Sequence, residues 1–449
     1  MNKRRFAIGR WTRAVAASVP LLAAQALVPA LLEPVLNGTV GAVAHAQAEA
    51  EPKDQPTRRT PALRNAVFEK LSEAQNLAEE KKYSEALKIL DDQRSKTGSA
   101  ALNSYELANL YNLYAFIHYS QENYSQALDA YRKVIEQPEI PVALEVNTRY
   151  TVAQLYFVME EWKRGLDELK KWMSMVENPG ANAYVLLAQG YYQLEDYNQA
   201  LSNVERAIGM YRKEDKVPRE QWLTLARFLH YDRGNVDEAI KLLVELVTHY
   251  PKKDYWVQLS YMYGEKKQDK LQLAAMETAY VQGMLEQERE LLNLAYLFLA
   301  NEVPYKAGKV VDQGIKAKQI EPTAKNLELL ANAWRAAQEV KRSIPVMEEA
   351  ARKSDDGDLY ARLGNIYVDS EEFEKAINAI SAGFQKGGVK RPDTANLVLG
   401  MAYFNTEQYD KARKAFEAAG KDDRSKAYAE QWIQYMESEL ERQESLRDV

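Results

Sequence analysis

The chain has 449 residues, 46% hydrophobic and 28% charged, a composition that excludes a disordered or collagen-like protein. It has no cysteine and only 4 histidines. Disulfides, thiolate zinc sites and iron–sulfur clusters are thereby excluded, and we expect no metal and no cofactor. With 59 basic and 65 acidic residues the formal charge is -6, so no general attraction for nucleic acid is expected.

Residues 1–46 have the layout of an export signal. Basic residues including Arg4 and Arg5 precede an apolar run over residues 14–32, and Ala44-His45-Ala46 forms a small-x-small cleavage pattern before Gln47. Cleavage after residue 48 is a second option. The sequence therefore predicts a cleaved signal and a periplasmic location. An uncleaved inner-membrane anchor is the alternative, because residues 14–32 are about as long as a bilayer requires.

Residues 47–63 are rich in proline and charge, which predicts a flexible leader. No later apolar stretch approaches the length of a membrane span, so we expect none after signal cleavage. From residue 64 onward the chain has helical periodicity and regularly spaced turns, with no alternating strand pattern.

Two segments, which begin at Tyr360 and Asn396, align without a gap. Both carry a Leu-Gly pair, then a Tyr, then an aromatic residue, an Ala and a large apolar residue: Leu363-Gly364, Tyr367, Phe373, Ala376 and Ile380 in one, and Leu399-Gly400, Tyr403, Tyr409, Ala412 and Phe416 in the other. This pattern resembles the tetratricopeptide repeat family. The resemblance implies an all-α solenoid of helix-turn-helix repeats wound as a right-handed superhelix.

A small residue of the first helix, called the anchor below, recurs along the chain and predicts about ten repeats over residues 64–420. The anchors are Ala74, Ala115, Ala153, Ala188, Arg227, Ser260, Ala295, Ala331, Gly364 and Gly400. A second small residue recurs in the second helices, where the two helices of a repeat cross closely.

Three positions depart from this repeat pattern. Arg227 is large for an anchor, the sixth repeat fits only with its second helix displaced by about two residues, and Pro345 predicts a late start or a kink in the second helix of the eighth repeat. After the last repeat, residues 421–449 are expected to form a capping helix and tail, with Trp432, Tyr435 and Met436 at helical spacing.

No residues form a catalytic motif, so we predict that the chain is not an enzyme. Glu160-Glu161 and Glu371-Glu372 are pairs of carboxylates, but both occupy the same place in the repeat and are interpreted as solvated turns. His118 and His230 replace the packed Tyr of the first helix and are interpreted as core residues.

The resemblance implies a binding surface, because first helices line the concave face of such arrays. On each first helix, four positions point into the groove, of which two precede the anchor and two follow it. Carried over to this chain, these positions give a candidate set rich in aromatic and amide side chains: Asn112, Phe116, Tyr119, Asn147, Tyr150, Gln154, Phe157, Asn182, Gln189, Tyr192, Gln221, Phe228, Tyr231, Tyr261, Tyr296, Asn332, Arg335 and Asn365.

This mixture suits recognition of peptides or proteins, although any single aromatic residue can instead pack between neighbouring first helices. The Lys and Asn pairs with which chaperone adaptors of the family hold a terminal carboxylate are absent from the corresponding positions, so a chaperone adaptor is not expected.

The expected function is a non-catalytic periplasmic scaffold whose partners are cell-envelope proteins. The layout of signal, leader and repeats is similar to that of exported repeat proteins associated with TonB-type energy transduction in Gram-negative bacteria. A scaffold for envelope assembly or polysaccharide export is an alternative. A carbohydrate-active enzyme with an aromatic groove is an alternative of another class, and Glu328 and Asp358 are its clearest candidate acids. The sequence pattern does not indicate an oligomeric state.

Overall fold

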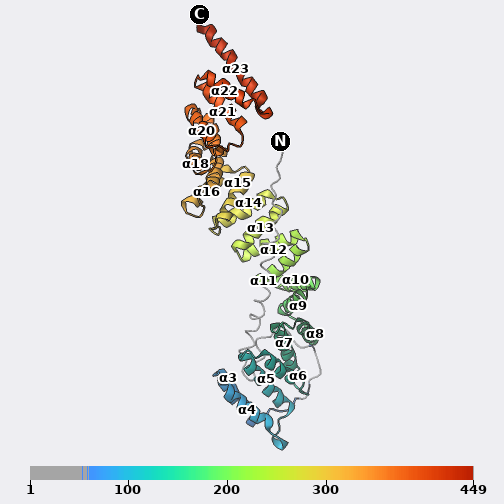
Figure 1. Cartoon of the computed structure of the whole chain (residues 1–449). Coiled ribbons are helices and arrows are strands. Elements are labelled where there is room, and N and C mark those ends of the chain that lie inside the picture. The colour runs from blue at the N-terminus through green and yellow to red at the C-terminus, as the bar shows by residue number, and fades with distance from the viewer. Residues whose placement is uncertain (1–52, 54–57, 59, 448–449) are drawn as a thin grey trace. The chain divides into compact units, whose positions relative to one another are not determined.

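The computed structural model describes residues 53, 58 and 60–447 (Figure 1). Within these residues it contains 21 α-helices and no β-strand. None of these helices combines the length and the apolar composition that crossing a bilayer requires. The predicted signal over residues 1–46 lies outside the described residues, as does most of the leader.

The helices follow one another as ten pairs and a final helix, which confirms the predicted all-α repeat fold (Figure 1). Two compact units divide the chain at Pro251. The unit that ends there contains α3 (Asn65–Glu79) and α4 (Tyr83–Ser95), α5 (Ser104–Ser120) and α6 (Tyr124–Ile135), α7 (Val142–Val158) and α8 (Trp162–Met175), α9 (Ala181–Gln193) and α10 (Tyr197–Lys213), and α11 (Glu220–Asp232) and α12 (Val236–His249).

The unit that begins at Lys252 contains five more pairs and the final helix. They are α13 (Lys253–Glu265) and α14 (Asp269–Val281), α15 (Glu288–Ala300) and α16 (Pro304–Lys316), α17 (Ala324–Ala336) and α18 (Val340–Lys353), α19 (Asp358–Asp369) and α20 (Phe373–Lys386), α21 (Pro392–Asn405) and α22 (Tyr409–Ala419), and α23 (Asp423–Arg447). Within each unit, a second helix packs against both its own first helix and the next one.

One interval recurs in all ten pairs: the second helix begins nine residues after the anchor, as Tyr83 does after Ala74. The predicted displacement of the sixth second helix is therefore wrong, because α14 begins at Asp269, nine residues after Ser260. Gln272 occupies its small position. A Cβ atom on Gly264 would lie 2.7 Å from the side chain of Gln272, so a missing side chain on α13 makes room for a large one on α14.

The turn between paired helices also has one geometry. The residue seven positions after each anchor has a positive φ, from Lys81 (φ 61°) to Glu407 (φ 59°), and only Gly234 among these ten is a glycine. Glu160 and Glu371 are two of them, and both are exposed. This placement confirms that the acidic pairs mark solvated turns.

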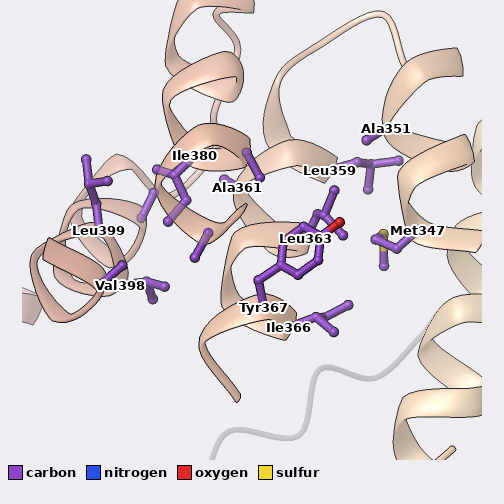
Figure 2. Close-up of a cluster of buried hydrophobic side chains, with 14 of the residues drawn as sticks. Met347, Ala351, Leu359, Ala361, Leu363, Ile366, Tyr367, Ile380, Val398 and Leu399 are labelled. Carbon is purple, nitrogen blue, oxygen red and sulfur yellow. The ribbon is translucent and has the colours of Figure 1, made fainter. Parts of the chain in front are cut away.

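The core consists of side chains from consecutive pairs, as Figure 2 shows for the eighth to tenth. Leu363 and Tyr367 of α19 lie between Met347 of α18 and Ile380 of α20. Each of these four side chains is buried. Because every pair buries its apolar surface on its neighbours, no single pair has a complete core of its own.

Pro345 does not delay α18. The helix begins at Val340, in the common register, and continues past Pro345 to Lys353, so the predicted late start is wrong. Proline removes the one hydrogen bond that its N–H would make to the preceding turn. The buried contacts of Ser343 and Met347, on either side of Pro345, hold the helix against the core.

The final helix caps the last pair, as predicted. Trp432 stacks on Phe416 of α22 with 5.7 Å between ring centroids, and Met436 is buried. Tyr435 remains 55% exposed. The start of α23 is tied to α21 through Asp393, a buried carboxylate that accepts hydrogen bonds from Ser425 (2.8 Å) and Arg391 (3.0 and 2.7 Å).

Two described leader residues contact the third pair. The Arg58 guanidinium binds the Glu145 carboxylate at 2.7 Å, and the backbone N–H of Lys53 donates to the carbonyl oxygen of Met175 at 3.0 Å. Both of these leader residues therefore make specific contacts with a helical pair.

Candidate binding surface

The candidate residues all lie on first helices. On each first helix they occupy up to four positions, six and three residues before the anchor and one and four after it, and we call these four positions the first-helix stripe. Spacings of three and four residues place them on one face of an α-helix. In α9, for example, the stripe is Asn182, Val185, Gln189 and Tyr192.

Three members of the candidate set are buried and cannot line a binding surface. Phe157 is 1% exposed, Gln189 is 1% exposed and Gln154 is 3% exposed. The Phe157 ring fills the space left by two glycines, since a Cβ atom on Gly165 or Gly190 would lie 2.9 or 2.7 Å from it. The prediction that these three residues contact a partner is therefore wrong, because each is part of the packing.

The other aromatic candidates of the third to fifth pairs remain half-buried. Tyr192 of α9 and Phe228 of α11 meet edge to face, with ring centroids 6.0 Å apart and an angle of 76°. The ring of Tyr150 packs against Trp172 of α8, with ring centroids 4.6 Å apart. Tyr231, one helical turn beyond Phe228, is also half-buried. The stripes of α9 and α11 are thus joined by a direct aromatic contact.

Amide side chains begin the stripe in these same pairs. Asn147 and Asn182 are half-buried and Gln221 is exposed. The Oδ1 atom of Asn182 is buried and accepts no hydrogen bond within the described chain. In the second pair, the candidates Asn112, Phe116 and Tyr119 are half-buried, and Tyr119 packs on Tyr124 at 5.6 Å.

The stripes of the second unit differ in charge. Tyr296 is 48% exposed and Asn332 is exposed, whereas Tyr261 and Asn365 are half-buried. Arg335 binds Asp369 at 2.6 Å, a contact between the eighth and ninth pairs. Its guanidinium is therefore engaged within the chain.

Glu328 and Asp358, the two candidate acids of an enzyme, also form ion pairs within the chain. Arg362 binds Glu328 at 2.5 Å and Asp358 at 3.0 Å, and Asp358 also accepts the backbone N–H of Lys390 at 3.0 Å. These contacts join the eighth, ninth and tenth pairs. Both carboxylates thus have a structural role.

His230 is buried, and its Nε2 atom lies 3.0 Å from Glu205 Oε1, which confirms its interpretation as a core residue. His118 is half-buried and stacks on Tyr114, with ring centroids 6.4 Å apart. Burial lowers the pKa of His118.

One residue that supports this surface was absent from the predicted set. Val185 and Thr224 occupy the stripe position of Tyr150, but both are buried. Trp172 supports Tyr150 from the second helix. Its signal in the sequence is its place seven residues after Gly165, on the face of α8 that meets α7.

Comparison with known proteins gives the family of the repeats. Residues 185–254 and 361–426 match the model of the tetratricopeptide repeat family, and they cover most of the fourth and fifth pairs and of the ninth and tenth. The anchor interval and the turn geometry are the same in all ten pairs. The chain is a tetratricopeptide repeat protein.

Superkiller complex protein 3 of Homo sapiens is 24% identical over 310 residues, a match that covers 65% of this chain and 19% of that protein. The chain thus spans about a fifth of the length of this curated relative. Among solved structures, the MamA protein is 20% identical, with 38% of this chain and 92% of that chain covered and a TM-score of 0.33.

Two further structures are similar to the chain. A tetratricopeptide repeat protein from Parabacteroides merdae ATCC 43184 is 17% identical, with 68% of this chain and 100% of that chain covered and a TM-score of 0.32. YrrB, described as a tetratricopeptide repeat protein with an unusual peptide-binding site, is 18% identical, with 43% of this chain and 89% of that chain covered and a TM-score of 0.32.

Proposed function

We propose that the chain is a non-catalytic scaffold that binds segments of other proteins on its first-helix stripe. Its tetratricopeptide fold supports a role in protein–protein interaction. The observation that carries the proposal is the joined pair of stripes on α9 and α11, where Tyr192, Phe228 and Tyr231 are half-buried. Partly exposed aromatic rings on a rigid support offer large contact area at low entropic cost.

We further propose that this scaffold acts in the periplasm, where its partners are cell-envelope proteins. The support is the signal pattern of residues 1–46 and the leader that follows. An accessory role in TonB-type energy transduction or outer-membrane transport fits this layout. A scaffold for envelope assembly or polysaccharide export fits the same features.

Affinity capture with a folded variant tests the stripe. In the double variant Tyr192→Ala, Tyr231→Ala, two partly exposed rings are lost, and truncation of dominant contacts costs about 2 kcal/mol or more each. We expect the envelope proteins that the parent captures, identified by mass spectrometry after stringent washing, to be depleted at least tenfold.

The matched control is Tyr428→Ala, which removes a ring that is 63% exposed on α23. It should retain the partners of the parent. If the double variant, shown to be folded by circular dichroism, captures the same partners with undiminished affinity, the stripe does not bind them.

A further inference from the structure

Two arginines that precede α3 each bind a buried carboxylate in the first turn of a later first helix. Arg64, directly before α3, donates to Glu106 of α5 from its backbone N–H at 3.0 Å and from its guanidinium at 2.8 and 2.6 Å. Arg58 of the leader donates to Glu145 of α7 at 2.7 Å. Glu106 and Glu145 are 0% and 8% exposed. The two arginines thus match the acids of two consecutive first helices, and the first turn of α9, the next one, contains no acid.

Two backbone contacts of the leader lie along the same edge of the array. The side-chain amide of Asn103, at the start of α5, donates to the carbonyl oxygen of Ala62 at 2.9 Å. The backbone N–H of Lys53 donates to the carbonyl oxygen of Met175, the last residue of α8, at 3.0 Å. From Arg64 back to Lys53, the contacts therefore pass from the second pair to the third, along the edge where first helices begin.

The contact with Glu145 joins parts of the chain that are not neighbours in the array. Arg58 precedes the first pair, whereas Glu145 belongs to the third and lies 87 positions further along the chain. In a repeat array each pair contacts mainly the pairs beside it, so an end pair can open while the rest stays folded. While Arg58 remains bound, opening of α3 and α4 releases a closed loop in place of a free end, and a closed loop gains less conformational entropy. The contact therefore opposes opening of the first pair.

The Glu145 carboxylate has a separate donor for each of its oxygens. Oε1 accepts from Arg149, on the same helix, at 3.0 and 2.9 Å, and Oε2 accepts from Arg58. Arg149 also binds Glu168 of α8 at 2.7 Å, so its guanidinium is shared between two acids. Glu168 has Lys171 as a further cation at 3.2 Å. Loss of Arg58 would take the donor from one oxygen of a buried carboxylate, which costs free energy.

We propose that the leader is a strap that stays docked along this edge after the signal is removed, that Arg58 fastens it to the third pair, and that the strap stabilises the first pair against local opening. The surface involved is distinct from the first-helix stripe, because Glu145 lies in the first turn of α7, before the stripe begins, and Met175 lies on a second helix. The proposal goes beyond the proposed function and requires no partner protein.

Hydrogen exchange and limited proteolysis test the strap in the full chain without its predicted signal. Arg58→Gln removes the charge that fastens the strap and keeps a long polar side chain. We expect the amides of α3 and α4 to exchange about threefold to fivefold faster in this variant, as followed by mass spectrometry. A protease specific for lysine should cleave after Lys53 faster by a similar factor, because the backbone of Lys53 is held by Met175 in the docked strap.

Glu145→Gln removes the same ion pair from the other side and should give the same two changes. Its matched control is Glu160→Gln, which neutralises an exposed carboxylate in the turn of the same pair and should behave like the parent. Glu145→Gln also alters the contact with Arg149. Faster exchange of α7 and α8 in that variant alone is therefore assigned to Arg149, and only the changes shared with Arg58→Gln support the strap.

Two outcomes would overturn the proposal. If both variants are cleaved after Lys53 at the rate of the parent, the leader is not docked. If cleavage is faster but α3 and α4 exchange as in the parent, the leader is docked without stabilising the first pair, and it is not the strap proposed. Neither measurement involves a partner protein, so both outcomes are distinct from a failure of the proposed function.

Discussion

The hydroxyl group of Ser343 in α18 donates a hydrogen bond of 2.8 Å to the carbonyl oxygen of Ala331 in α17. These residues occupy the two small positions where the helices of the eighth pair cross, and both are fully buried. In the sixth pair the direction is reversed, since Ser260 of α13 donates to the carbonyl oxygen of Gln272 in α14, also at 2.8 Å. A serine at the crossing therefore links the two helices as well as letting them approach.

Ser343→Ala should lower the free energy of unfolding by about 1 kcal/mol, because it removes this hydrogen bond and leaves the packing unchanged. Ser343→Leu should cost more, by about 1 to 3 kcal/mol beyond the alanine variant, because the larger side chain separates α17 from α18. Thermal unfolding followed by circular dichroism compares the two. Equal stability of the parent and the leucine variant would show that the crossing is not close-packed.

Gly357 and Gly209 should respond in opposite ways to substitution by alanine. A Cβ atom on Gly357 would lie 1.9 Å from the carbonyl oxygen of Gly383, so the backbone must move. We expect Gly357→Ala to lower the free energy of unfolding by about 2 kcal/mol or more. Gly209 lies within α10 with nothing inside 4 Å of such an atom. Gly209→Ala should stabilise the protein by about 0.5 to 1 kcal/mol through helix propensity.

Urea unfolding of the two alanine variants checks this contrast. A destabilised Gly209→Ala variant, or a Gly357→Ala variant as stable as the parent, would contradict the described contacts.

The positive φ of the turns predicts that a glycine there is favourable. Gly234→Ala places a side chain at φ 76° and should lower stability by about 1 kcal/mol, whereas Glu371→Gly (φ 59°) should be neutral or raise it slightly. The measurement is the melting temperature of each single variant. A neutral Gly234→Ala variant would show that the turn of the fifth pair tolerates a side chain.

Asp393 makes the last pair and the cap sensitive to acid. Hydrogen bonding from Arg391, assisted by Ser425 and opposed by burial, holds the pKa of Asp393 well below its ordinary value of 3.8. Since the pKa is lower in the folded state, the carboxylate contributes stability above the unfolded-state pKa, and this contribution is lost as pH falls toward the folded-state pKa.

The pKa of the half-buried neighbour Asp422 shifts in the same direction, because hydrogen bonds from Arg424 lower it to about 2. Asp393→Asn should therefore melt at a lower temperature than the parent at about pH 7, and the difference should shrink as pH falls to about 2. Hydrogen exchange of α21 and α23 locates the effect. A difference that is independent of pH would exclude the charge of Asp393 as its cause.

Export predicts a defined N-terminus. Mass spectrometry of the native protein should find Gln47 or Glu49 as the first residue, in the soluble envelope fraction, if the signal is cleaved at one of its two small-residue patterns. Recovery of peptides with Arg4 and Arg5 from the membrane fraction would establish the anchored form.

Local patterns in the sequence are enough to predict where the two helices of each repeat lie. Small residues at most anchors, aromatic residues near the starts of many second helices and charged residues in the turns recur from repeat to repeat, and these features can be read from residues close together in the sequence. The all-helical fold, the ten pairs and the capping helix were predictable for this reason. The displacement assigned to the sixth pair failed because it ignored the space that Gly264 leaves for Gln272.

Only the tertiary structure decided which stripe residues are open to a partner. Phe157 and Tyr192 occupy the same position in consecutive repeats, yet Phe157 is 1% exposed and Tyr192 is half-buried. The difference arises from Gly165 and Gly190, which leave room for the Phe157 ring between α8 and α9. Likewise, Arg335 occupies a stripe position but forms an ion pair with Asp369 of the next pair of helices. Exposure depends on neighbours that come from other helices, and a position within a repeat does not encode them.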